Sequence, residues 1–381
     1  MKRLTLLTVF PPLAAAAVSA AILVLFSGCY VLQQGTTMLG YLYSAVPLEE
    51  LAEREGSTEN GRENGQENGR ESERRFVERI HDIRRFASQT LGLASNSNYT
   101  KYVELDRDYL AAVVSACAKD SFTPYEWWFP VTGSVPYKGF FNEEDAREEA
   151  ASLKEKDLDV WIRRVDAFST LGWFSDPLYS YMKNYPVWRL ANLIIHEQLH
   201  ATVYIQGNSQ FNEELAEFVG TEGSALYMIQ AFGEDSEEYT AMKNREADAA
   251  AYISFIKGLI AELENLYSGP NTREEKLRQK ELIIQAAQKR FTENYSLLFR
   301  GEGYRGFSKL SINNAYLGNF RLYYAHGDYL KNLYTRSGSD LQKFIEAAKT
   351  LGDSDSTDEP GLQLEKALGL LPPAPNPAKT E

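Results

Sequence analysis

The sequence predicts an α+β fold, because helical and strand-like segments occupy different parts of the chain. Apolar residues recur at helical spacing in FVERIHDIRRFASQTLGL (76–93) and through the charged region 238–300. Between these regions, YVELDRDYLAAVVSAC (102–117) and FTPYEWWFPVTGSVPYKGFF (122–141) are rich in β-prone residues, and the second is broken by Pro and Gly. We therefore expect a small β-sheet region and a mainly helical C-terminal part.

The composition allows a sizeable core and excludes one class of partner. Of the 381 residues, 44% are hydrophobic and 12% aromatic, which suffices for a large folded domain. The net charge of -13 argues against nucleic-acid binding, for which a basic face is the usual signature. Two cysteines are too few for a disulfide framework.

The N-terminus reads as a secretory signal peptide over residues 1–28. A basic start leads into an apolar stretch and then small residues before Cys29. Residues 27–29 resemble a bacterial lipobox, with Phe26 in place of the usual leucine. We expect a membrane-anchored lipoprotein of the bacterial cell envelope, lipidated at Cys29. The alternative is an uncleaved anchor over residues 4–26, and both place the domain outside the cytoplasm.

Composition divides the rest of the chain into four parts. Residues 29–51 form an anchor-proximal segment, expected to contain a short helix. Residues 52–74 hold a polar ENGR/ENGQ repeat and are expected to be a disordered insertion. The folded domain should cover 75–350, and the tail 351–381 should be partly disordered.

Within the domain, each remaining element has its own pattern. EEDAREEAASLKEKD (143–157) predicts a charged helix, and DVWIRRVDAFSTLGWF (159–174) predicts one or two strands. The region 238–300 predicts an antiparallel helical hairpin that turns at SGPNT (268–272), and it could cover a cleft or support it. His81 lies alone on its predicted helix and is expected to be a surface or packing residue.

The stretch HEQLH (196–200) holds two of the four histidines. On a helix, His196 and His200 lie on one face, so both imidazoles can bind one ion. Zinc binds neutral imidazole, and a catalytic zinc has three protein ligands and an open position for water. Glu197 lies about 100° around the helix, where it can take a proton from that water.

The alternative is an amphipathic helix whose polar residues face water. The preceding run VWRLANLII (187–195) is strongly apolar, which indicates a buried helix. Burial of histidines and a glutamate without partners is costly, and a metal would serve as that partner.

A third ligand can come from a second helix that follows the Gly207 turn. On FNEELAEFVG (211–220), Glu213 and Glu217 lie four residues apart and share one face. Spacing alone does not rank them, and a solvated acidic face is the alternative. Small residues, including Gly220, predict close packing of the two helices.

These blocks together resemble a bacterial putative aminopeptidase family of lipid-anchored zincin metallopeptidases. The resemblance covers roughly residues 76–345. It implies a zincin-like core with one zinc ion per chain and a catalytic base at Glu197. The implied zinc ligands are His196, His200 and Glu213. Phe168 stands where the family usually has tyrosine, and the 52–74 insertion is a second departure.

The resemblance also implies further site residues. A strand edging the cleft would pair with substrate backbone, and Ser169–Trp173 are the candidates for it. Tyr323 in SINNAYLGNFRLYY is the expected oxyanion donor, with Tyr316 and His326 as alternatives. Glu217 could hold a ligand histidine or meet the amino group of a substrate.

The expected function is that of a zinc-dependent peptidase acting on peptide substrates as an aminopeptidase. Two alternatives stay open at this point. One is a zinc endopeptidase with the same core, and the other is a non-catalytic, zinc-binding structural lipoprotein. The presence of Glu197 argues against the last, since a structural site needs no general base.

Overall fold

The computed structural model describes residues 30, 33–53, 63–129, 133–166, 176–323, 327–352 and 358–370. Within these residues helices predominate beside three small sheets, so the α+β prediction is confirmed. No helix in this part of the chain is both long enough and apolar enough to span a bilayer. The predicted signal peptide, Cys29, Ser169–Trp173, His326 and residues 371–381 lie outside the described residues.

The N-terminal part contains more helix than the sequence predicts. Residues 33–44 are helical and lead into β1 (Val46–Pro47) and α2 (Leu48–Glu53). The long helix α3 (Glu63–Gln89) follows. Residues 63–74 are therefore helical, whereas the sequence predicts disorder there; residues 54–62 lie outside the described part.

The strands form three separate sheets. In the first, β2 (Lys101–Val103) pairs antiparallel with β1 and parallel with β8 (Leu178–Tyr179). In the second, β3 (Ala111–Ala118) lies between β6 (Lys138–Phe140) and β7 (Leu158–Val165), antiparallel to both. The third is the hairpin of β4 (Trp127–Phe129) and β5 (Gly133–Val135).

Strand β3 is buried on both faces, which explains its nearly continuous run of small and apolar residues. Helix α4 (Glu143–Glu155) covers one face through Ala146, Ala150 and Leu153. Helix α10 (Asn314–Tyr323) lies against the other, where Asn319 Nδ2 donates to Ser115 Oγ at 3.2 Å.

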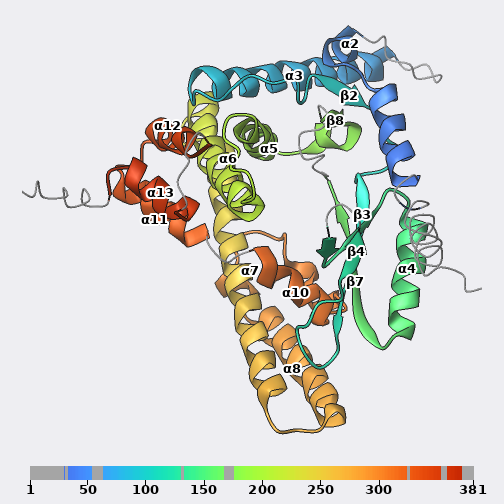
Figure 1. Ribbon diagram of the computed structural model, residues 1–381. Helices are drawn as coiled ribbons and strands as arrows, with labels where there is room; N and C mark the ends of the chain where they lie inside the picture. The colour runs from blue at the N-terminus through green and yellow to red at the C-terminus, as the bar shows by residue number, and fades with distance from the viewer. Residues whose placement is uncertain are drawn as a thin grey trace, which may run out of the picture.

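A second layer is built from helices alone. Helices α5 (Val187–His200) and α6 (Ser209–Phe232) pack against each other and against α3. The short 3-10 helix η1 (Ser180–Asn184) precedes α5. On the side of α6 away from the sheets lie α11 (Gly327–Arg336), α12 (Leu341–Gly352) and α13 (Pro360–Ala367), as Figure 1 shows. The largest hydrophobic core lies among these helices.

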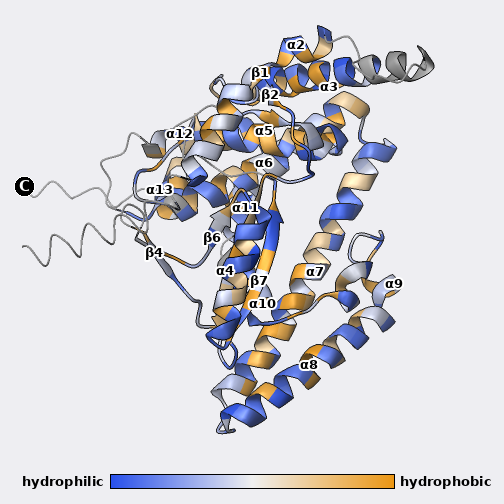
Figure 2. Ribbon diagram, turned by 90° about the vertical axis from the view of Figure 1, so that its right-hand side faces the viewer, coloured by the Kyte–Doolittle hydropathy of each residue, from blue (hydrophilic) through white to orange (hydrophobic). Residues whose placement is uncertain are grey.

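The predicted helical hairpin is confirmed. It consists of α7 (Glu237–Ser268) and α8 (Arg273–Glu293), and Thr272 caps α8 in a capping box with Glu275. Hydrophobic residues recur along both helices in Figure 2. They enclose a second core with α9 (Tyr295–Leu298), η2 (Arg305–Lys309) and α10.

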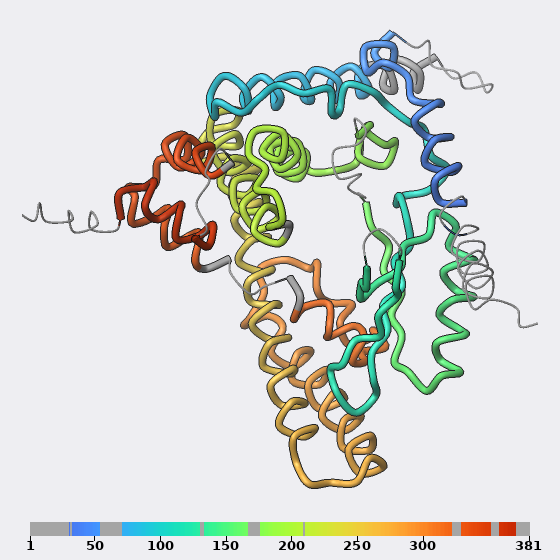
Figure 3. The backbone as a smooth tube through the Cα atoms, viewed as in Figure 1, coloured from blue at the N-terminus to red at the C-terminus, as the bar shows by residue number. Residues whose placement is uncertain are grey.

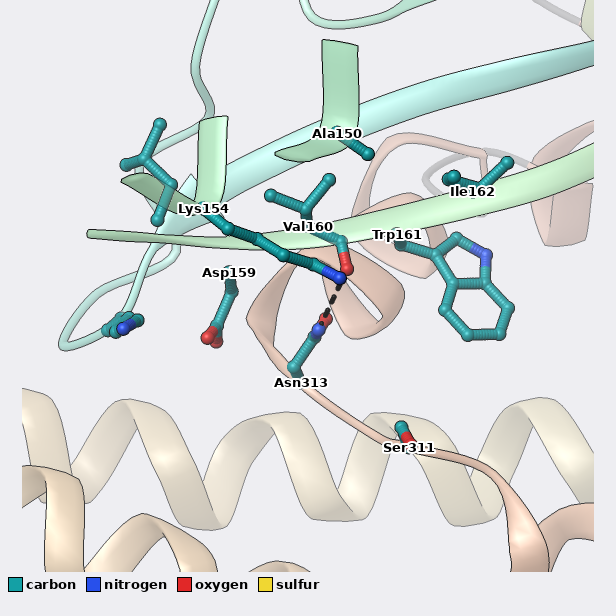
Figure 4. A pocket seen from close by; sticks show the side chains of 10 residues that line it. Ala150, Lys154, Asp159, Val160, Trp161, Ile162, Ser311 and Asn313 are labelled. Carbon is teal, nitrogen blue, oxygen red and sulfur yellow. Dashed lines mark hydrogen bonds between the residues drawn. The ribbon is translucent and has the colours of Figure 1, made fainter. Parts of the chain in front are cut away.

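A buried polar network fixes the hairpin to the sheet. Lys280 on α8, only 3% exposed, lies with its Nζ 2.6 Å from Asp159 Oδ2 on β7. The same carboxylate oxygen accepts from the backbone N–H of Asn314 at 2.9 Å. Figure 4 shows the neighbouring contact, in which Asn313 Nδ2 donates to Val160 O at 3.0 Å. The hairpin therefore supports the sheet through satisfied hydrogen bonds.

Candidate metal centre

Helix α5 carries both histidines of HEQLH in its last two turns, and its apolar side is buried. Leu190, Ile194 and Leu199 are at most 3% exposed. The helix ends where the backbone N–H of Val203 bonds to Leu199 O at 2.7 Å. Gly207, with a φ of 80°, then turns the chain toward α6.

Asn212 joins the loop between the helices to the first turn of α6. Its Oδ1 accepts from Ile205 N and its Nδ2 donates to Ile205 O, both at 2.9 Å. Asn212 is 3% exposed, so this pair of bonds is shielded from water. These two hydrogen bonds fix where α6 begins, and thereby the position of the adjacent Glu213.

The two helices approach closely through glycines on α6, as the small-residue pattern predicts. A Cβ added at Gly220 would lie 3.1 Å from Asn192 O and 3.3 Å from the Cβ of His196. A Cβ at Gly223 would lie 3.0 to 3.1 Å from side-chain atoms of Leu91 and Ile195. In Figure 3, α5 is seen nearly end-on, next to α6.

This packing brings His196, His200 and Glu213 together. The two Nε2 atoms are 3.1 Å apart. Glu213 Oε2 lies 3.5 Å from His196 Nε2, and its Oε1 lies 3.4 Å from His200 Nε2. One potential ligand atom from each of the three residues lies within 4.8 Å of the others. The histidine side chains are 17% and 18% exposed and that of Glu213 59%, so the group is open on the carboxylate side.

Glu217 occupies a different position from Glu213. Its Oε2 lies 3.8 Å from Nδ1 of His196, the ring nitrogen opposite the cluster. Thr221 Oγ1 donates to its Oε1 at 3.5 Å. The structure therefore separates two carboxylates that sequence spacing could not rank.

Charges within the group perturb one another. Burial alone would lower the pKa of His196, but the hydrogen bond that it donates to Glu213 and the charges of Glu197 and Glu217 raise the pKa overall. Hydrogen bonds from both histidines hold the pKa of Glu213 well below its usual range. Burial raises the pKa of Glu197, against the opposing effect of the two imidazoles.

Two other predicted residues lie away from this group. The hydroxyl of Tyr316 pairs with that of Tyr252 inside the second core, so Tyr316 is a packing residue. His81 lies on α3 with its Nε2 3.7 Å from Glu49 Oε1, as expected for a surface residue. Tyr323 is the last residue of α10, and its side chain is outside the described part of the chain.

The sequence did not single out Tyr99, a buried tyrosine whose pKa is affected by the charge of Glu197. Tyr99 is 3% exposed, and its backbone has a left-handed φ of 59°, which is uncommon for a bulky side chain. Burial, and next the charge of Glu197, raise its pKa, so the phenol keeps its proton. The only sequence signal is the polar run SNSNYT that contains it.

Hydrogen bonds between the loop of residues 94–100 and its surroundings hold Tyr99 in this conformation. Arg84 Nη2 donates to Asn96 O at 2.6 Å, and Ala94 N donates to Thr202 Oγ1 at 2.9 Å. Tyr99 N donates to Asp176 O at 2.7 Å. Through these bonds the loop contacts Thr202, just after the end of α5, and Asp176, which comes shortly after the predicted edge strand Ser169–Trp173.

The pocket between β7 and the start of α10 contains none of the predicted site residues (Figure 4). Asp159 and Asn313 line it, and both already have partners: Asp159 accepts from Lys280 of the hairpin, and Asn313 donates to Val160 O. It is therefore a structural junction and not part of the histidine site.

Comparison with known proteins gives one match. The family model described as "Putative aminopeptidase" matches residues 29–360, which is most of the chain and includes every residue of the candidate centre. No curated protein and no solved structure matches the chain. The chain thus belongs to the putative aminopeptidase family.

Proposed function

We propose that this protein is a zinc-dependent peptidase, acting as an aminopeptidase, in which His196, His200 and Glu213 hold one zinc ion. The observation that carries the proposal is the convergence of two Nε2 atoms and one carboxylate beside Glu197. Membership of the putative aminopeptidase family supports the peptidase class.

The donor set fits zinc. Two imidazoles and one carboxylate form one of the usual ligand sets of catalytic zinc, which leaves a further position open. The 59% exposure of Glu213 means that the open side of the group is accessible. Glu217, whose Oε2 lies 3.8 Å from His196 Nδ1, is our proposal for the group that orients that ring from behind.

Bound zinc would act as a Lewis acid on the substrate carbonyl and on a water molecule. The carboxylate of Glu197 accepts a proton from the attacking water and delivers it to the nitrogen of the departing amine. Tyr323 remains our proposal for the donor to the carbonyl oxygen.

For localisation, we propose a lipoprotein of the bacterial cell envelope that is lipidated at Cys29. The support is the sequence, in which a basic start, an apolar stretch and small residues precede this cysteine.

The test combines metal analysis with hydrolysis of matched peptides. Purified protein should contain one zinc per chain, and it should cleave peptides with a free amino terminus but not the same peptides after N-acetylation. Equal cleavage of acetylated peptides would favour the endopeptidase. Stoichiometric zinc without any turnover would favour the structural lipoprotein.

A further inference from the structure

The helix of residues 33–44 exposes a surface without charge. No Asp, Glu, Lys, Arg or His occurs between residues 4 and 48, although 24% of the whole chain is charged. Leu39 is 56% and Tyr43 96% exposed, and they lie four residues apart on one helix face. A helix on a water-facing surface normally presents polar or charged side chains there. This face therefore has the composition of a contact surface.

The opposite face of this helix is fixed to the domain. Gln34 Oε1 accepts from the backbone N–H of Phe141 at 2.8 Å. The ring of Tyr41 lies 5.6 Å from that of Phe141, and its hydroxyl accepts from Arg107 Nη2 at 2.7 Å. Because these contacts set the rotation of the helix, Leu39 and Tyr43 stay on the outside. Figure 3 shows the helix, in blue, at the outer edge of the molecule.

The chain is already attached to the domain at Tyr30, one residue after Cys29. The hydroxyl of Tyr30 donates to Gly139 O on β6, and its ring lies 5.5 Å from that of Phe140. Lys138 Nζ lies 4.7 Å from the ring centroid of Tyr30. One residue spans at most about 3.6 Å, so a lipid on Cys29 would hold this edge of the domain at the bilayer surface.

We propose that the Leu39–Tyr43 face lies in the interface of a lipid bilayer and fixes the orientation of the domain on the membrane. The inference rests on the proposed lipidation of Cys29. Tyrosine suits the level of the headgroups, and leucine adds apolar area below it. The face has no basic residue, so contact does not depend on anionic lipid.

The experiment places a fluorophore on this face and on a matched control position. Leu39→Cys and Leu282→Cys are labelled with an environment-sensitive dye in the full-length protein. The two leucines are 56% and 58% exposed, and Leu282 lies on α8, far from the N-terminal helix. Cys117 is 3% exposed and should not react. Wild-type protein serves as the blank, because a lipidated Cys29 has no free thiol.

The proteins are reconstituted into vesicles of phosphatidylethanolamine and phosphatidylglycerol. At position 39 the dye should be quenched by brominated acyl chains and be several-fold less accessible to aqueous iodide than at position 282. Vesicles of phosphatidylcholine alone should give the same result.

If the protein floats with the vesicles but iodide reaches both positions equally, the inference is wrong. The proposed lipid anchor is then unaffected. Protein that does not float would overturn both. Absence of peptidase activity in correctly oriented protein would remove the peptidase assignment alone.

Discussion

Glu213 contacts both histidines of the cluster through its two carboxylate oxygens, whereas Glu217 reaches only the far side of His196. Glu213→Ala should therefore lose most of its zinc under dialysis that leaves Glu217→Ala at least partly loaded. Loss of an orienting partner costs about 10–100-fold in affinity or activity, which is less than loss of a ligand. Metal analysis after dialysis measures both. A reversed order would make Glu217 the ligand.

Glu197 tests the chemistry separately from metal binding. Glu197→Gln keeps the size of the side chain but cannot accept a proton. Turnover should fall by about 10²–10⁴-fold, the usual contribution of a general base. Zinc content should stay at the wild-type level, since this side chain is not among the proposed ligands. Loss of zinc from this variant would contradict the assigned role.

Among the individual residues of the site, the sequence predicted those that come together through helical spacing alone. His196 and His200 share a face because they are four residues apart. The roles of Asn212 and Tyr99 could not be predicted in the same way. They depend on a bond to Ile205 and on a left-handed backbone held by Asp176, which exist only in the folded chain.

At the scale of the elements, the contact between α5 and α6 depends on Gly220. Gly220→Ala would place a methyl group 3.1 Å from Asn192 O and 3.3 Å from the Cβ of His196. We expect a destabilisation of about 1–3 kcal/mol, the usual cost of overpacking, together with weaker zinc retention. Thermal unfolding and metal analysis check the two effects.

Gly258 in α7 is the matched control, because it is helical and nothing lies within 4 Å of an added Cβ. Gly258→Ala should be neutral or stabilising by up to about 1 kcal/mol, since alanine favours helix. Similar loss of stability in both variants would show that close packing at Gly220 is not the cause.

The helical hairpin was predictable because its apolar stripes and its Pro-Asn turn are local signals. The helical start of α3 was not. Residues 63–74 have no apolar side chain, and a lack of core-forming residues predicts disorder. At the end of this stretch, charge pairs four residues apart support the helix, with Arg74 Nε 3.2 Å from Glu78 Oε1 and Arg75 Nε 3.6 Å from Glu71 Oε1.

At the scale of the whole molecule, attachment to the membrane is proposed to depend on Cys29. Cys29→Ser should abolish labelling by a radioactive fatty acid and release the protein from membranes in fractionation. A variant that remains membrane-bound and keeps its full length would instead support the uncleaved anchor over residues 4–26.

The proposed zinc ligands all lie in one short stretch of the chain, from His196 to Glu213. The contacts that bring them together are local, and closing so short a loop costs little conformational entropy. Strand pairing between β2 and β8, by contrast, joins residues 102 and 178. Local contacts of this kind tend to form early in folding. If the proposed zinc site is correct, its three ligands would come together before the distant strand pairs form, and bound zinc would stabilise this early local unit as well as the finished site.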